Sequence, residues 1–120
     1  MSATLFERCG GFSCVRGIVT GFYRRMLDSP RLGRYFASLN MRRLIEHQTK
    51  FITYVMGGPA TYADAQLARS HQGLGISAAE FAEMLELLRA TLEEAGLEGA
   101  DLDQVLNGVR QRERLIVAQR

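Results

Sequence analysis

Apolar residues recur at steps of three and four positions along most of this 120-residue chain, and this period constrains its fold more than any other feature. Residues with that spacing share one face of an α-helix. Because no segment shows a convincing strand pattern, the sequence predicts an all-α fold. The first long stripe ends near Asp28, directly before Ser29 and Pro30, and it contains Val15, Ile18, Val19, Phe22, Tyr23, Met26 and Leu27.

Two more long helices are predicted in the middle of the chain. One ends at Gly57-Gly58-Pro59, because glycine permits left-handed backbone and proline cannot continue a helix. The other begins at Ser77, which can form a capping box with Glu80, and continues to Gly96. The apolar stripe of the first of these helices consists of Leu44, Gln48, Phe51, Ile52 and Val55.

The two remaining segments are an irregular stretch in the middle of the chain and a last helix. Gly73 and Gly75 indicate irregular backbone around a short helical turn between Tyr62 and Gly75. Asp101 is expected to cap a last helix that continues from Leu102 to Gln119. The residues that this last helix is expected to bury are Leu102, Val105, Val109 and Ile116.

Composition limits the classes of function. Basic and acidic side chains number 15 and 13 and are scattered, so nothing indicates nucleic-acid binding. No segment approaches the roughly 20 apolar residues that span a bilayer, and we expect a soluble, cytoplasmic protein without a membrane partner. A single domain over residues 1–120 should bury roughly two thirds of its unfolded surface. Cys9 and Cys14 fit neither a redox nor a zinc motif and are expected to be reduced thiols.

The two histidines, His47 and His71, are the candidate metal ligands. His71 stands beside a glycine-rich segment, where a histidine is more often a surface or capping residue than a ligand. His47 lies at the edge of a helical stripe and reads equally well as a half-buried histidine. Their separation of 24 residues matches no local metal motif, so spacing alone leaves both interpretations open.

An ordered set of residues from Leu5 to about Val117 resembles group I of the truncated haemoglobins. Gly10-Gly11 looks like the glycine pair after the short first helix of that family, and Phe22-Tyr23 looks like its distal aromatic pair. Phe36 follows Tyr23 by thirteen residues, as in the family. The resemblance implies a truncated globin, a two-over-two helical sandwich around haem. The further matching segments are Met41-Arg42-Arg43-Leu44, His47-Gln48, Phe51, Tyr54, Gly57-Gly58-Pro59 and His71-Gln72-Gly73-Leu74-Gly75-Ile76.

The resemblance also implies roles for individual residues. His71 would be the proximal ligand of the iron, with its other ring nitrogen bonded to a backbone carbonyl. Tyr23 and Gln48 would donate hydrogen bonds to a gas on the distal side, although a core tyrosine and a solvated glutamine are the alternatives. Arg43 would meet a haem propionate or remain exposed. The residues expected to contact the cofactor are Phe36, Met41, Arg43, Leu44, Phe51, Leu67, Ile76 and Phe81.

His47 decides the state of the sixth coordination position. Some members of the family with a histidine here use it as a sixth ligand of the iron. Adjacent helical residues point about 100° apart, so His47 and Gln48 cannot both face the iron without movement of the helix. We therefore keep two hypotheses, an open site and a site closed by His47.

Three functions follow, and they belong to different classes. The first is a globin that reversibly binds O2, NO and CO, with nitric oxide dioxygenation as an enzymatic use that needs a reductase. The second is a bis-histidine globin for electron transfer or for ligand or redox sensing. The third is a helical interaction module without haem. The haem would be haem b bound non-covalently, since the last helix has no histidine and no C-x-x-C-H motif occurs. The expected assembly is a monomer or weak dimer.

Overall fold

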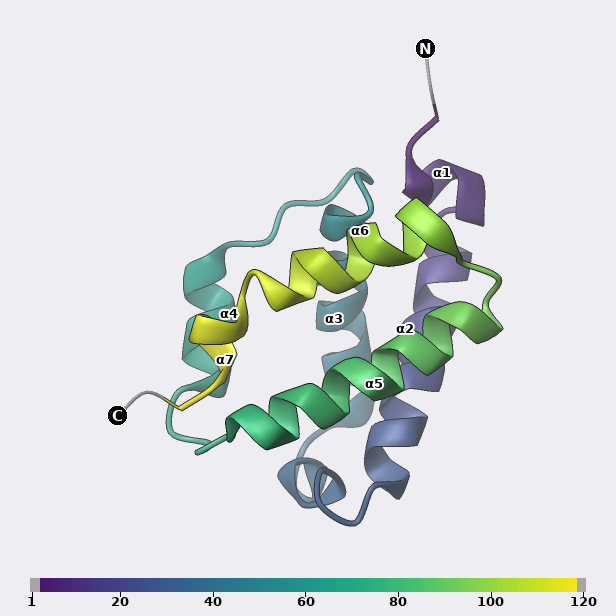
Figure 1. Cartoon of the computed structure of the whole chain (residues 1–120). Coiled ribbons are helices and arrows are strands. Elements are labelled where there is room, and N and C mark those ends of the chain that lie inside the picture. Colours follow the sequence, from purple (N-terminus) through teal and green to yellow (C-terminus); the bar gives the residue numbers. More distant parts are fainter. Residues whose placement is uncertain (1–2, 119–120) are drawn as a thin grey trace.

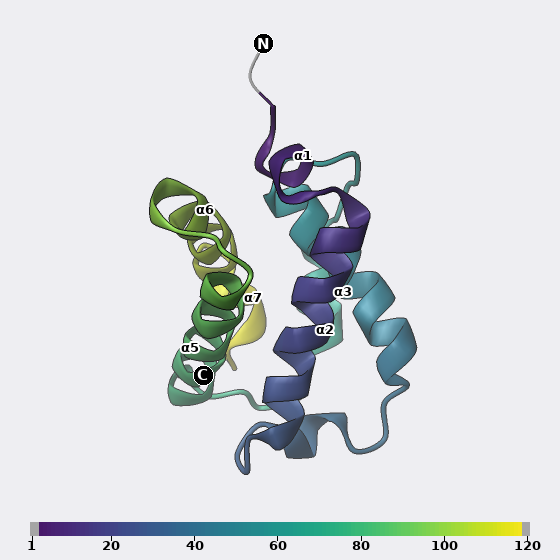
Figure 2. The same ribbon diagram turned by 90° about the vertical axis from the view of Figure 1, so that its right-hand side faces the viewer.

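The computed structural model describes residues 3–118, and its helices form two layers (Figures 1 and 2). The described residues contain no strand, so the predicted all-α fold is confirmed. No described helix is long and apolar enough to cross a bilayer. The elements are α1 (Leu5–Cys9), α2 (Phe12–Asp28), the 3-10 helix η1 (Gly33–Phe36), α3 (Met41–Val55), α4 (Asp64–His71), α5 (Ala78–Glu94), α6 (Gly99–Arg110) and α7 (Glu113–Ile116).

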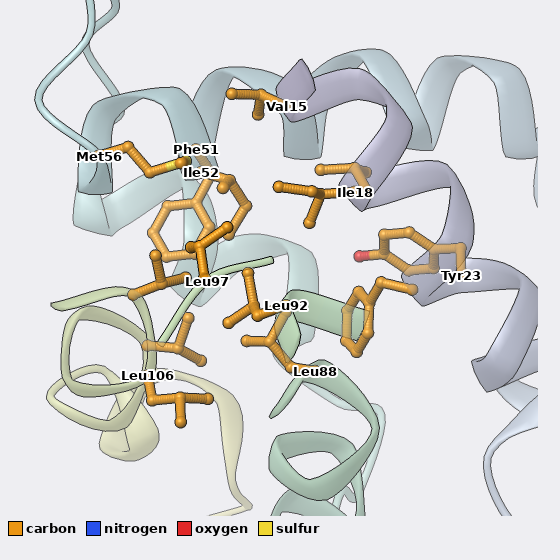
Figure 3. Packing of buried hydrophobic residues seen from close by; sticks show 14 of the residues in the cluster. Val15, Ile18, Tyr23, Phe51, Ile52, Met56, Leu88, Leu92, Leu97 and Leu106 are labelled. Carbon is orange, nitrogen blue, oxygen red and sulfur yellow. The ribbon is translucent and has the colours of Figure 1, made fainter. Parts of the chain in front are cut away.

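The layers pair α2 with α3 and α5 with α6, which is the expected two-over-two arrangement (Figure 2). Helix α2 packs against both α3 and α5, and it therefore joins the two layers. Buried side chains from all four helices meet between the layers, including Val15, Phe51, Leu92 and Leu106 (Figure 3). Burial of such side chains is the main favourable contribution to folding.

The three long helices begin and end close to the predicted positions. Helix α2 ends at Asp28 and α3 ends at Val55, just before Gly57 adopts a positive φ of 81°. The capping box at the start of α5 is present, because Ser77 accepts from the backbone of Glu80 and the Glu80 carboxylate accepts from the backbone of Ser77. Local signals in the sequence are sufficient for these boundaries.

The predicted last helix is wrong in two respects. Helix α6 begins at Gly99, before Asp101, and no side chain caps it. It ends at Arg110, and α7 starts separately at Glu113, so the chain bends where a continuous helix was expected; Gln119 lies outside the described residues. Because the chain bends here, α7 packs against α4 (Figure 1). Helix α4 has eight residues, more than the short turn predicted between Tyr62 and Gly75.

The prediction of reduced cysteines is also wrong, because Cys9 and Cys14 form a disulfide. Their Cα atoms are 6.0 Å apart, across the turn between α1 and α2. Gly10 and Gly11 form this turn with φ values of 123° and 76°, which residues with a Cβ rarely adopt. The glycine pair thus folds the end of α1 back onto the first turn of α2, and the two sulfur atoms meet.

Candidate functional site

A cavity of about 270 Å3 lies between the layers, next to the packed core. Its walls come from the second half of α2, from η1, α3 and α4, and from the first half of α5, and most of the lining side chains are apolar. Many of the residues singled out in the sequence line it, although they are distant along the chain. These residues are Tyr23, Phe36, Leu44, His47, Gln48, Phe51, Leu67, His71, Ile76 and Phe81.

Two of the expected cofactor contacts lie outside the cavity lining. Met41 is half-buried and packs against the hydrophobic core at the start of α3. Arg43 is exposed one turn of the helix before His47. The structure therefore brings the other predicted residues together without these two.

His71 is the last residue of α4 and is half-buried. Its Nδ1 is 2.8 Å from the backbone carbonyl oxygen of Leu67, the type of acceptor that the sequence analysis expected. A carbonyl can only accept, so Nδ1 carries the hydrogen and Nε2 is left with its lone pair. Burial lowers the pKa of His71, and the hydrogen bond to Leu67 opposes this shift in part. The imidazole is therefore held neutral, in the tautomer that presents Nε2 as an electron-pair donor.

Tyr23 extends from α2 into the same cavity and is buried. Its ring packs edge-on against Phe22 and Phe36, at centroid distances of 5.1 and 5.6 Å. Figure 3 shows its hydroxyl oxygen directed away from α2 toward the space between the layers, and no hydrogen bond joins it to another described residue. Burial, with a smaller contribution from Tyr62, raises the pKa of Tyr23, so its hydroxyl stays protonated and can donate.

Two adjacent residues of α3, His47 and Gln48, complete one wall. Gln48 is half-buried and His47 is exposed, although both line the cavity. Burial raises the pKa of Tyr62, and the nearby Gln48 side chain opposes this shift in part. Tyr62 packs against Phe51 at a centroid distance of 5.2 Å. Sequence reasoning missed Tyr62 because an aromatic residue in a loop contributes to no helical stripe.

A buried carboxylate, Glu80, lines the cavity at the start of α5. It accepts hydrogen bonds from the Ser77 backbone at 2.9 Å, the Tyr35 hydroxyl at 2.8 Å and the Arg34 guanidinium at 3.0 Å. The Ser77 backbone and then Tyr35 contribute most to lowering the pKa of Glu80 to about 2, against the effect of burial. The capping motif had indicated only the contact with Ser77. The carboxylate also ties η1 to α5 at the edge of the cavity.

These features fit a large, flat, apolar cofactor that carries a metal with one protein ligand. One wall offers the neutral Nε2 of His71, and the cavity is also lined by Tyr23, whose hydroxyl makes no hydrogen bond to a described residue. A polar ligand in the cavity could accept a hydrogen bond from this hydroxyl. The walls around the space are mostly apolar, as is usual for a cofactor site.

Comparisons with known proteins agree with this arrangement. Residues 4–117 match the family described as bacterial-like globin. The group 1 truncated hemoglobin of Tetrahymena thermophila is 33% identical over 103 residues, which cover 86% of this chain and 82% of that protein.

Two solved structures have the same fold. The Fe(III) form of truncated hemoglobin from Tetrahymena pyriformis superposes with a TM-score of 0.87 at 26% identity, covering 98% of this chain and 100% of that one. The 2/2 hemoglobin of a Synechococcus species, in the cyanomet state with covalently attached heme, gives a TM-score of 0.83 at 27% identity over 95% and 98% of the two chains. The chain belongs to the bacterial-like globins, within the truncated haemoglobins, a family whose members bind haem and diatomic gases, as the residue pattern predicted.

Proposed function

We propose that this chain holds haem b non-covalently through His71 Nε2 and reversibly binds O2, NO and CO on the opposite side of the cofactor. The observation that carries the proposal is the pairing of His71 Nδ1 with the Leu67 carbonyl, which leaves Nε2 free beside an apolar cavity. When bound, the haem would supply an iron that can take a diatomic ligand. The protein supplies the proximal ligand, the apolar walls and the distal donors.

Tyr23 and Gln48 are proposed as the distal donors. The Tyr23 hydroxyl is protonated and makes no hydrogen bond to a described residue, so it can donate to a ligand without first giving up another hydrogen bond to the protein. The Gln48 side chain lines the same cavity and is close enough to the Tyr62 hydroxyl to influence its pKa. Two donors in the cavity would slow the escape of a polar ligand more than of CO.

Non-covalent attachment is supported by the positions of the histidines and cysteines in the chain. No histidine follows His71 in the sequence, so the last helices offer no imidazole to a vinyl group. Both cysteines are engaged in the disulfide and neither belongs to a haem-attachment motif. The covalent attachment named for the Synechococcus protein is therefore not proposed for this chain.

Nitric oxide dioxygenation, with a separate reductase, is proposed as the enzymatic use of the site. A second candidate is a bis-histidine globin, and it is favoured by one observation: His47 lines the same cavity as His71. His47 is exposed, so its imidazole would have to turn inward from α3 to reach the cofactor. Ligand binding would then be limited by the reverse movement.

Spectra of the wild type, His71→Ala and His47→Leu test these proposals. We expect a Soret band in the purified wild type, loss of haem retention in His71→Ala, and retention in His47→Leu. Full haem retention by His71→Ala would contradict the assignment of the proximal ligand. High-spin bands in unliganded wild type, unchanged in His47→Leu, would exclude the bis-histidine form. Rapid oxidation of the oxygenated protein on mixing with NO would favour dioxygenation.

A further inference from the structure

Arg112 lies at the bend between α6 and α7, and its guanidinium contacts three helices, α3, α4 and α6. Its side chain is only 17% exposed, unusually little for an arginine. Nη1 donates to the Gly108 carbonyl of α6 at 2.6 Å, and Nε donates to Asp64 of α4 at 3.0 Å. The same guanidinium lies 5.5 Å from the ring centroid of Phe51 and 5.8 Å from that of Tyr54, both on α3.

Asp64 is the first residue of α4, the helix that ends in His71. Asp64, Leu67 and His71 are spaced by three and four residues, so they follow one face of this two-turn helix. No side chain caps the N-terminus of α4, and Leu67 is its only buried residue. The ion pair with Arg112 therefore provides a polar restraint at the uncapped start of this helix.

Arg112 also contacts the opposite side of the cavity through Phe51, which lines it. The guanidinium of Arg112 thus contacts both Asp64, at the start of α4, and Phe51, in the cavity wall formed by α3. A lysine could pair with Asp64 but could not also donate in a fixed plane to Gly108 and stack over two rings.

We infer that Arg112 is a positioning residue for the proximal histidine: by fixing Asp64 relative to Phe51, it sets how closely and at what angle His71 Nε2 approaches the haem iron. The inference rests on the proposed function, since it requires His71 to be the ligand. It assigns Arg112 no contact with the cofactor.

A purely structural ion pair would lower stability without altering the bond between His71 and iron. The chain offers a matched control, the pair formed by Arg8 and Asp101, which joins α1 to α6 through hydrogen bonds of 2.8 and 2.9 Å. Neither of these residues lines the cavity. Arg8→Met therefore removes a comparable interaction away from His71.

The test compares Arg112→Met, Arg112→Lys, Asp64→Asn and Arg8→Met, all made in a His47→Leu background so that the ferrous iron has no second histidine. The measurements are the iron–histidine stretching band in resonance Raman spectra, the rate of haem transfer to excess apo-globin, and thermal unfolding. We expect Arg112→Met and Asp64→Asn to shift the band and to lose haem about 10-fold faster, the lower end of the effect of outer-shell partners. Arg112→Lys should be intermediate.

Arg8→Met should lower the melting temperature and leave both the band and the haem-loss rate unchanged. Asp64→Asn is nearly isosteric, so it tests the inference even if Arg112→Met folds poorly. If Arg112→Met and Asp64→Asn match Arg8→Met in band position and haem loss, Arg112 does not position His71, and the proposed function still stands. Absence of haem from the parent protein would overturn both.

Discussion

The two sides of the cavity are built in different ways. On one side, α3 has fifteen residues, an Asn40 cap that accepts from Arg43, four buried residues and extensive packing against α2. On the other side, α4 has eight residues and no side-chain cap. After α4 the chain continues through Gly73 and Gly75, both with positive φ.

Helices of fewer than about 12 residues are not stable alone in water, so α4 depends on contacts with other parts of the molecule. Those contacts are Leu67, the Arg112 ion pair, α7 and, in the proposed function, the bound cofactor. The comparison indicates that the α3 side of the cavity is formed by the chain itself. In the proposed function, the α4 side is completed by the bound cofactor.

Removal of the haem should give the largest difference in hydrogen-exchange protection between the α3 side and the α4 side of the cavity. In the apoprotein, we expect the amides of α4 to exchange with solvent at opening free energies near zero, while those of α2 and α3 keep several kcal/mol of protection. The apoprotein should also lose much of its cooperative unfolding transition, because an apolar cavity replaces part of the core. Hydrogen exchange followed by mass spectrometry measures both sides in one sample. Equal protection of α3 and α4 without haem would contradict the comparison.

Tyr23→Phe should produce the next largest effect, on the side that the chain builds itself. The substitution keeps the ring contacts with Phe22 and Phe36 and removes only the hydroxyl. If that hydroxyl donates to the bound gas, O2 should dissociate about 10- to 100-fold faster, the range for a hydrogen bond of 1.5–3 kcal/mol to a charged acceptor. Stopped-flow O2 displacement measures the rate.

The matched control for this substitution is Tyr62→Phe. It removes the hydroxyl that lies near the Gln48 side chain, so its effect on O2 dissociation should be smaller and should disappear in a Gln48→Leu background. Haem content should be unchanged in both tyrosine variants. Equal O2 dissociation rates in wild type and Tyr23→Phe would remove Tyr23 from the distal site.

The sequence predicted the α3 side of the cavity better than the α4 side. The α3 side depends on local signals, whereas the α4 side depends on contacts between distant parts of the chain. The boundaries of α2, α3 and α5 depend on local periodicity, caps and glycines, and these signals are visible in the chain. The break after Arg110 was missed because no local signal marks it; the contact between Arg112 and Asp64 beside it joins residues 48 positions apart. The disulfide was missed because spacing does not reveal that Gly10 and Gly11 turn the chain back. His71 and Tyr23 could be placed together only through the resemblance, since no periodic pattern relates them.

Glu80→Gln should have a more moderate effect, on the stability of the edge between η1 and α5. The variant weakens the hydrogen bonds from Ser77, Tyr35 and Arg34, and we expect the free energy of unfolding at pH 7 to fall by about 2 kcal/mol. The pKa of Glu80 is lowered to about 2 in the folded state, so its contribution is present above its ordinary pKa of 4.5 and is lost as the pH falls toward 2. The difference between wild type and variant should therefore shrink between pH 5 and about 2. Denaturant unfolding at several pH values measures it, and a difference that grows in acid would contradict the assignment.

Opening the disulfide should have the smallest effect on the site, because α1 and α4 lie apart (Figure 1) and neither cysteine lines the cavity. In a Cys9→Ser/Cys14→Ser double variant, the free energy of unfolding should fall by at most about 2 kcal/mol, as expected for a bond that closes a short loop. The hydrogen exchange of α4 and the rate of haem loss should stay as in the wild type, since stability lost at α1 does not reach the restraints at Asp64. Faster haem loss in this variant would mean that α4 responds to global stability alone, and the two sides of the cavity would then differ only in degree.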